Sequence, residues 1–280
     1  MIRRLGRLVL SAAWPLLIVA TVFYAAVPYI ERRMTFHPRT LDPKAPRQLP
    51  PGTLEVTLPA ADGVRLHGWF LTATGVRNGT TVLFLHGNGA LVLDHAADLV
   101  FLQKRGFDIL AIDYRGYGLS EGRSLGEATL VLDGAAAWRH LTVERRIDPT
   151  DIALLGYSLG TTVAVDLAIA APCRAIAMMA PLDSAERHAR RMMGLLPDFY
   201  FARMQNRFDT VGKIGRARCP VLVVHGERDT TIFIAQGRAV YEAAKPPKRM
   251  IAVPDADHWL PLNERSSYAS ELAAFLTGGS

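Results

Sequence analysis

The chain has 280 residues, half of them apolar, which is enough to bury the core of one large domain. Its formal net charge is +6, but the basic residues are scattered or lie beside an apolar N-terminal run, and none forms a nucleic-acid-binding motif. The two cysteines lack the spacing of a metal or redox site. We therefore expect no nucleic acid, metal or cofactor among the partners.

The first segment is an apolar run over residues 8–30, which is 23 residues without a charge. It is long enough to cross a bilayer as a helix, and it follows Arg3, Arg4 and Arg7. We predict a single-pass membrane anchor over residues 1–34 rather than a cleaved signal peptide, because the run is long and no A-x-A site follows. The short basic tail favours the cytoplasm, so we expect the following domain on the exported (periplasmic or extracellular) side, although basic residues after the run oppose this orientation.

A proline-rich stretch follows the apolar run. Residues 35–52 are predicted to form a linker, and residues 53–280 are predicted to form the main domain. The segments 53–58 and 64–70 alternate in polarity around Ala61-Asp62-Gly63, which predicts a hairpin of antiparallel strands at the start of this domain.

Beyond the hairpin the pattern changes to short, nearly continuous apolar runs separated by segments with helical spacing. Such runs are typical of strands that are covered on both faces. Alternation with helices predicts an α/β fold with a mostly parallel, doubly wound sheet. The predicted strands are residues 81–85, 109–112, 152–155, 176–179, 221–224 and 250–253, and the predicted helices are residues 93–105, 126–140, 160–171, 232–244 and 264–276.

Two further features fall between these elements. Cys173 and Cys219 each precede a predicted strand, so the sequence allows either a disulfide between them or two separate buried thiols. Residues 183–213 form an insertion with a basic part, which includes His188, and an apolar part. We interpret it either as a short lid over the active face or as an ordinary pair of surface helices.

A glycine-flanked serine lies between the strand at 152–155 and the helix at 160–171. The pattern Gly156-Tyr157-Ser158-Leu159-Gly160 in this context indicates a nucleophile elbow rather than a glycine-rich turn of another doubly wound protein. Side chains at either glycine would collide with the neighbouring helix or strand, and the strained turn would expose the serine hydroxyl. Ser158 is therefore the predicted nucleophile. The backbone N–H of Leu159, at the start of the helix, is a predicted donor to an oxyanion.

A serine nucleophile needs a base and a carboxylate that orients the base. Of the histidines after the serine, which are His188, His225 and His258, only His258 lies on the loop after the last strand, so it is the predicted base. Asp229 lies just past the carboxyl end of the strand at 221–224 and is the predicted acid, with Glu227 as its nearest rival.

The second oxyanion donor is expected on the loop after the first parallel strand. This loop has the sequence Leu85-His86-Gly87-Asn88-Gly89, and its glycines allow the backbone to approach a substrate closely. We predict that the backbone N–H of Asn88 acts together with that of Leu159. His86 is expected to be structural.

Five motifs follow one another along the chain, namely His86 to Gly89, Asp113 to Gly122, Gly156 to Gly160, His225 to Asp229, and Asp257-His258. In this order they resemble the α/β-hydrolase superfamily, and the resemblance covers about residues 53–276. It implies the α/β-hydrolase fold, with the closest likeness to membrane-anchored serine hydrolases of the lysophospholipase, acyl-thioesterase and dienelactone-hydrolase-like group. A serine at the elbow argues against the haloalkane dehalogenase and epoxide hydrolase branches, which use an aspartate there.

We therefore predict a membrane-tethered serine hydrolase that cleaves a carboxylic ester or thioester of an acyl or lipid-like substrate through an acyl-enzyme. Two alternatives stay open, namely a non-catalytic, membrane-anchored binding module with this fold and a serine peptidase of the same fold. The peptidase is disfavoured because the sequence shows no site for a free amino or carboxyl end.

Overall fold

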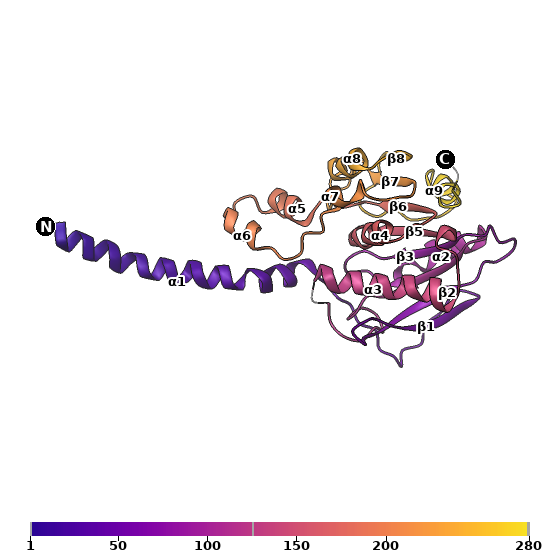
Figure 1. The fold of residues 1–280 in the computed structure, drawn as a ribbon, viewed down its shortest axis with the longest axis horizontal. Coiled ribbons are helices and arrows are strands. Elements are labelled where there is room, and N and C mark those ends of the chain that lie inside the picture. The colour runs from indigo at the N-terminus through magenta and orange to yellow at the C-terminus, as the bar shows by residue number, and fades with distance from the viewer. Residues whose placement is uncertain (1, 125, 279–280) are drawn as a thin grey trace.

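A computed structural model describes residues 2–124 and 126–278, except for the side chains of residues 2–13 and Leu16. Its centre is an eight-stranded sheet with the order β1-β2-β4-β3-β5-β6-β7-β8 (Figure 1). β2 pairs antiparallel with both β1 and β4, and all other neighbours are parallel, so the predicted hairpin and mostly parallel sheet are confirmed. The strands are β1 (Thr53–Pro59), β2 (Arg65–Leu71), β3 (Thr81–Leu85), β4 (Asp108–Ile112), β5 (Ile152–Tyr157), β6 (Ala175–Met179), β7 (Val221–Gly226) and β8 (Lys248–Val253).

Helices cover both faces of the sheet, as the continuous apolar strands require. In β3, Leu83 and Leu85 belong to the core that also contains residues of α3, α4 and α8, whereas Val82 and Phe84 belong to the core under α2 and α9. Neighbouring residues of one strand therefore fill two separate cores. The helices of the domain are α2 (Ala96–Lys104), α3 (Glu127–Arg139), α4 (Leu159–Ala170), α5 (Ala185–Met192), α6 (Asp198–Arg203), α7 (Thr210–Ile214), α8 (Ile234–Ala243) and α9 (Ala269–Leu276), with short 3₁₀ or π segments at Val92–His95, His140–Glu144 and Pro149–Asp151.

The strand order changes direction at β3. This strand lies between β4 and β5, so the chain continues to one side of it first and to the other side later. The loops after β3 and β5 therefore diverge at the carboxyl end of the sheet and leave a crevice, which is where open α/β sheets bind ligands.

The N-terminal helix α1 (Ile2–Thr35) projects away from the sheet, and its C-terminal part lies beside α6 (Figure 1). The ring of Phe23 lies 5.8 Å from that of Phe199 and 6.1 Å from that of Tyr200, measured between centroids. Val27 is fully buried in the small core that joins the helix to the insertion. The insertion at residues 183–213, which contains α5 to α7, thus packs against α1.

Within the described residues, no helix is both long enough and apolar enough to cross a membrane. This finding does not support the predicted transmembrane anchor, and part of the predicted span, the side chains of residues 8–13 and Leu16, lies outside the described residues. Near the end of the span, Phe23, Val27 and Ile30 pack against the insertion. Arg3, Arg4 and Arg7, which set the predicted orientation, have side chains outside the described residues. The exported location and the division at residues 34 and 52 stay predictions.

Both cysteines are free and buried. A hydrogen bond with the side chain of Cys219, together with burial, raises the pKa of Cys173. The two cysteines lie just before β6 and β7.

Candidate active site

Ser158 lies in a strained turn between β5 and α4. Its φ and ψ are 50° and −117°, a backbone conformation that residues other than glycine rarely adopt. The turn is held by the backbone N–H of Ser158, which donates to Met179 O at 2.8 Å, and by Thr161, whose hydroxyl donates to Ser158 O at 2.6 Å. These hydrogen bonds on both sides of the serine therefore hold its strained backbone conformation in place.

The two flanking glycines are required by close backbone contacts. A Cβ at Gly160 would lie 2.0 Å from the carbonyl oxygen of Leu85 at the end of β3, and one at Gly156 would lie 2.6 Å from Cα of Thr161. Neither contact can be relieved by turning a side chain, because both partners are backbone atoms. The glycines thus let α4 start directly against β3 and β5, which brings Ser158 to the crevice.

The structure brings Ser158, His258 and Asp229 together from three separate loops. The Nε2 atom of His258 lies 3.2 Å from the Ser158 hydroxyl oxygen, and its Nδ1 atom lies 2.7 Å from Oδ2 of Asp229. Both distances are within hydrogen-bonding range. This continuous chain can draw a proton from the serine hydroxyl toward the histidine while the carboxylate fixes the orientation of the ring.

The carboxylate of Asp229 is 3% exposed and has donors on both oxygens. Oδ1 accepts the backbone N–H groups of Thr231 and Ile232 at 2.8 Å each. Oδ2 is shared by His258 and by Nε2 of His225, which lies 3.3 Å away. Burial alone would raise the pKa of Asp229, but the hydrogen bonds from His225, His258 and Ile232 outweigh it and hold the pKa well below its usual range. Asp229 is therefore ionised at neutral pH.

The other acidic and histidine candidates lie elsewhere. Glu227 is exposed on the same turn, Asp255 forms an ion pair with Arg228, and Asp257 accepts the backbone N–H of Trp259 at 2.8 Å. His225 is fully buried behind Asp229 and donates through Nε2 to Ile232 O at 2.7 Å. His225 thus supports the carboxylate and does not approach the serine.

The loop that carries His258 is held by hydrogen bonds to Tyr157, the residue before Ser158 in the elbow. The hydroxyl of Tyr157 donates to His258 O and accepts the backbone N–H of Leu260 at 3.1 Å. Because Tyr157 precedes Ser158 directly, one side chain ties the position of the histidine loop to that of the serine.

Asn88 and Leu159 line the same cavity as Ser158 and His258. In the part of the chain that the structure describes, the backbone N–H groups of Asn88 and Leu159 donate to no other protein group outside regular helices and strands. Both predicted donors therefore lie beside the serine with their N–H groups available.

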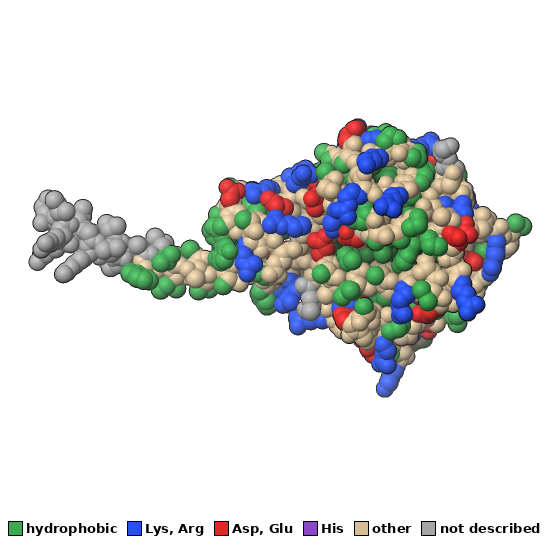
Figure 2. Space-filling model, in the orientation of Figure 1, with side chains coloured by type: hydrophobic (Ala, Val, Ile, Leu, Met, Phe, Trp, Pro, Cys, Tyr) green, Lys and Arg blue, Asp and Glu red, His purple; other side chains and the backbone are tan. Residues whose placement is uncertain are grey.

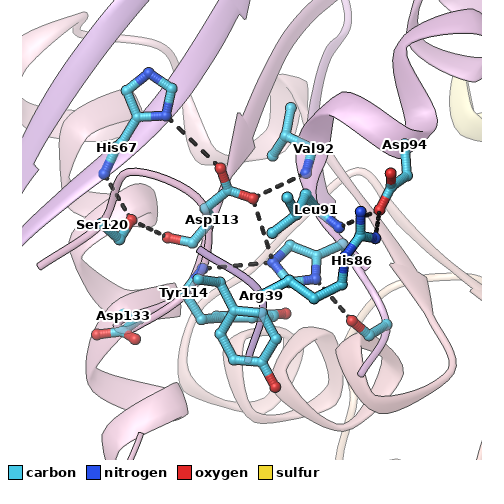
Figure 3. Close-up of polar contacts among 12 residues, drawn as sticks. Arg39, His67, His86, Leu91, Val92, Asp94, Asp113, Tyr114, Ser120 and Asp133 are labelled. Carbon is cyan, nitrogen blue, oxygen red and sulfur yellow. Dashed lines mark hydrogen bonds and ion pairs between the residues drawn. The ribbon is translucent and has the colours of Figure 1, made fainter. Parts of the chain in front are cut away.

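A buried polar network supports the loop that carries Asn88 (Figure 3). Oδ1 of Asp113, just after β4, accepts the backbone N–H of Val92 at 2.9 Å and lies 3.8 Å from Nε2 of His86. The backbone carbonyl of Asp113 accepts the hydroxyl of Ser120 at 2.6 Å. His86 has Nδ1 2.7 Å from Gly87 O, and burial lowers the pKa of His86, so this histidine is neutral and bonded within its loop as expected.

Comparisons with known proteins agree with this architecture. The family model described as "Alpha/beta hydrolase family" matches residues 82–274. The chain belongs to this family.

An uncharacterized protein of Mycobacterium tuberculosis is 32% identical over 245 residues, covering 86% of this chain and 86% of the relative. Alpha/beta hydrolase domain-containing protein 17C of Homo sapiens is 34% identical over 193 residues, covering 69% of this chain and 55% of the relative, so the match spans about half of that protein. Both relatives support the family assignment.

Solved structures show the same fold. Esterase Pf2001 of Pyrococcus furiosus has a TM-score of 0.66 at 21% identity, covering 86% of this chain and 96% of the esterase. An alpha-beta hydrolase of Vibrio vulnificus has a TM-score of 0.67 at 23% identity, covering 80% of this chain and 81% of that one. At such identities the likeness shows the fold alone.

In this alpha/beta hydrolase the cavity at Ser158 has a volume of about 590 Å³ and lies between α1, the insertion and the loops after β3 and β5. Its wall is largely apolar and rich in methionine, a flexible side chain that adapts to varied apolar ligands. The apolar part of the wall includes Met34, Leu182, Met192, Met193, Met204 and Phe208. Figure 2 shows hydrophobic side chains along the described part of α1 up to its junction with the insertion.

Several wall residues were missed from the sequence. Glu31, Met34 and Thr35 come from the end of α1, where the sequence predicts a membrane anchor and the start of a linker. Glu31 is 2% exposed, and its carboxylate accepts the backbone N–H groups of Gln205 and Asn206 at 2.8 and 2.7 Å. No local pattern marks this residue, because its partners lie more than 170 positions away along the chain.

His188 of α5 also lies in the wall, with Nδ1 3.3 Å from Nε2 of Gln236. Burial lowers the pKa of His188, so it is neutral at pH 7. Among the residues that the structure describes, no group of three or more His, Cys, Asp or Glu side chains could hold a metal ion.

Proposed function

We propose that this alpha/beta hydrolase is a serine hydrolase that cleaves a carboxylic ester or thioester of an acyl substrate through an acyl-enzyme. The observation that carries the proposal is the hydrogen-bonded chain from Asp229 through His258 to Ser158, with distances of 2.7 and 3.2 Å. A binding module has little need for an ionised, buried carboxylate at one end of this chain and a strained serine that lines the cavity at the other.

The geometry supports the following steps. His258 takes the proton as the Ser158 hydroxyl attacks the substrate carbonyl, and the ionised Asp229 stabilises the imidazolium that forms. The N–H groups of Asn88 and Leu159 stabilise the oxyanion of the tetrahedral intermediate. His258 then returns the proton to the leaving alcohol or thiol, which leaves the acyl-enzyme, and water hydrolyses that ester by the same steps.

The cavity favours an apolar acyl group. Its volume of about 590 Å³ is in the range of sites that enclose small-molecule ligands, about 300–1,000 Å³. The methionines and Phe208 give the acyl chain an apolar surface, and each buried methylene contributes about 0.8 kcal/mol to binding. A thioester or an oxygen ester fits equally well, because the reacting carbonyl is the same.

The first test is turnover of p-nitrophenyl esters of graded acyl length by the full chain, with fluorophosphonate labelling of Ser158 in parallel. We expect labelling of Ser158 and a rise in kcat/KM from the acetyl ester to chains that fill the cavity. A chain that neither hydrolyses any ester nor reacts with fluorophosphonate would be a non-catalytic binding module. Cleavage confined to peptides would favour the peptidase.

A second prediction concerns the acyl wall. Ala189 is 8% exposed on α5 and lines the cavity, so Ala189→Trp should fill part of the cavity. We expect the kcat/KM for the best long-chain ester to fall by about tenfold while that for the acetyl ester changes little, because about 1.4 kcal/mol of apolar binding corresponds to a factor of ten. Ala202→Trp, on the exposed side of α6, is the matched control. Equal chain-length profiles in the two variants would place the acyl group elsewhere.

A further inference from the structure

The segment that follows α1 runs across the loops of the active site. Residues 35–39, which we call the clasp, begin at the last residue of α1. The clasp is fixed on one side by the loop after β4, since the N–H of Gly118 donates to Arg39 O at 2.7 Å and the N–H of Leu41 donates to Gly118 O at 2.9 Å. On its other side the clasp faces the loop after β3.

The side chain of Asn88 is held almost entirely by the clasp. Its Nδ2 donates to Thr35 O at 2.7 Å and lies 3.0 Å from Nδ1 of His37. Its Oδ1 accepts the backbone N–H of His37 at 3.0 Å and the hydroxyl of Tyr117 at 2.9 Å. A primary amide has two donors and two acceptor positions, so every hydrogen-bonding position of Asn88 is used. The amide can neither rotate nor flip without breaking these bonds.

A second contact reaches the same loop independently. Arg39 donates through Nη1 to Gly89 O at 3.3 Å and to Oδ2 of Asp94 at 2.5 Å (Figure 3). The same Oδ2 atom accepts the backbone N–H of Leu91 at 2.9 Å. The guanidinium group of the clasp thus joins both ends of the segment from Gly89 to Asp94.

The loop after β3 needs such support because its own backbone can adopt several conformations. Residues 86–91 form no helix or strand, and Gly89 has a φ of +71°. An oxyanion donor is effective only when its N–H already points at the developing charge. The free energy needed to reorient it during the reaction would otherwise offset the stabilisation of the transition state. Asn88 would stabilise the oxyanion through its backbone N–H. Because its side chain is attached to the same residue, fixing the side chain also limits the movement of this N–H.

We propose that the clasp is a positioning element of the active site, which holds the side chain of Asn88 and the carbonyl of Gly89 so that the N–H of Asn88 points at the oxyanion. This inference rests on the proposed serine hydrolase function. It makes the end of α1 part of the catalytic structure, because the clasp starts where the helix ends. Glu31, one turn earlier, fixes that end of the helix to the insertion through Gln205 and Asn206.

Full-length variants test the proposal. Asn88→Ala keeps the backbone N–H but removes all four side-chain bonds, and Arg39→Ala removes the second contact. Arg47→Ala is the matched control, because Arg47 is also a linker arginine with a carboxylate partner, Glu55, but does not touch the loop after β3. Arg39→Lys tests rescue by a cation that can still pair with Asp94.

Removing an oxyanion donor outright lowers kcat by about 10²–10³-fold, and misorienting one should cost less. We therefore expect a fall in kcat of about tenfold for Asn88→Ala with little change in KM, a smaller fall for Arg39→Ala, and partial recovery in Arg39→Lys. A trifluoromethyl ketone forms a tetrahedral oxyanion on the serine, so its inhibition constant should rise by the same factor as kcat falls. The pH profile of kcat/KM should not move, because the clasp does not contact His258 or Asp229.

The possible outcomes distinguish a failure of the clasp proposal from a failure of the proposed function. Wild type that hydrolyses esters, together with an Asn88→Ala variant of unchanged kcat and ketone inhibition, would overturn the clasp alone. Wild type without turnover or fluorophosphonate labelling would overturn the proposed function. Thermal unfolding and circular dichroism report folding, so a loss of activity matched by a loss of folded protein would mean that the clasp is only structural.

Discussion

Ser158→Ala and His258→Ala are each expected to lower ester turnover by about 10⁴–10⁶-fold, because the residues of such a unit depend on one another. Without the hydroxyl no acyl-enzyme forms, and without the imidazole, whose Nε2 lies 3.2 Å from that hydroxyl, the serine stays protonated. The double variant is expected to lose no more than either single one. The measurement is kcat/KM for the preferred ester, read against the spontaneous hydrolysis rate.

Two replacements serve as controls. Ser266→Ala removes a hydroxyl that donates to Pro261 O, and His140→Ala removes an imidazole that pairs with Glu144 and Arg145, and neither residue lines the cavity. Both should retain the wild-type kcat/KM. Some residual activity is expected in the Ser158 and His258 variants, because the N–H groups that donate to the oxyanion and the substrate cavity are both retained. Full activity in Ser158→Ala would mean that another residue is the nucleophile.

The sheet and the elbow could be predicted because their signals are local. The apolar runs that became β3 and β5 to β7 are buried on both faces, and the two glycines at the elbow are required by backbone contacts within a few residues or with the adjacent strand. His258 and Asp229 could be placed because each directly follows a strand whose carboxyl end lies at the crevice. Chain order alone brought these residues to one edge of the sheet.

The role of the N-terminal segment could not be predicted in this way. The uncharged run before Glu31 has the composition of a membrane span, yet Val27 and Glu31 are buried against an insertion that lies far along the chain. The bonds between Asn88 and the clasp join residues 51 and 53 positions apart, and they involve backbone atoms that carry no sequence signal. The prolines in residues 35–52 predict a linker, but composition gives no sign of what that segment touches.

Asp229→Asn should lower kcat by about 10⁴-fold while leaving the fold in place. The carboxylate accepts the N–H at Nδ1 of His258 at 2.7 Å, which keeps Nε2 free to take the serine proton. An amide in its place can present its own N–H to the ring, which favours the wrong tautomer, and it cannot stabilise the imidazolium. The measurement is kcat for the preferred ester, with fluorophosphonate labelling as a second readout that should slow in parallel.

Glu227→Gln is the matched control, because Glu227 is an exposed acid two residues away on the same turn. It should change kcat by less than about twofold, as surface substitutions away from a site usually have small effects. If Glu227→Gln were as damaging as Asp229→Asn, the acid of the triad would be Glu227. The two variants therefore decide between the two carboxylates that follow β7.

Asp229→Asn should also change how the stability of the protein depends on pH. Because hydrogen bonds hold the pKa of Asp229 below that of the unfolded chain, the ionised group stabilises the fold above the ordinary aspartate pKa of about 4. This contribution is lost as the pH falls from that value toward the folded-state pKa. Asp229→Asn should therefore show a flatter decline of Tm in acid than wild type, whereas Glu227→Gln should follow the wild-type curve. Parallel curves for all three proteins would mean that Asp229 is not held ionised by His225 and His258.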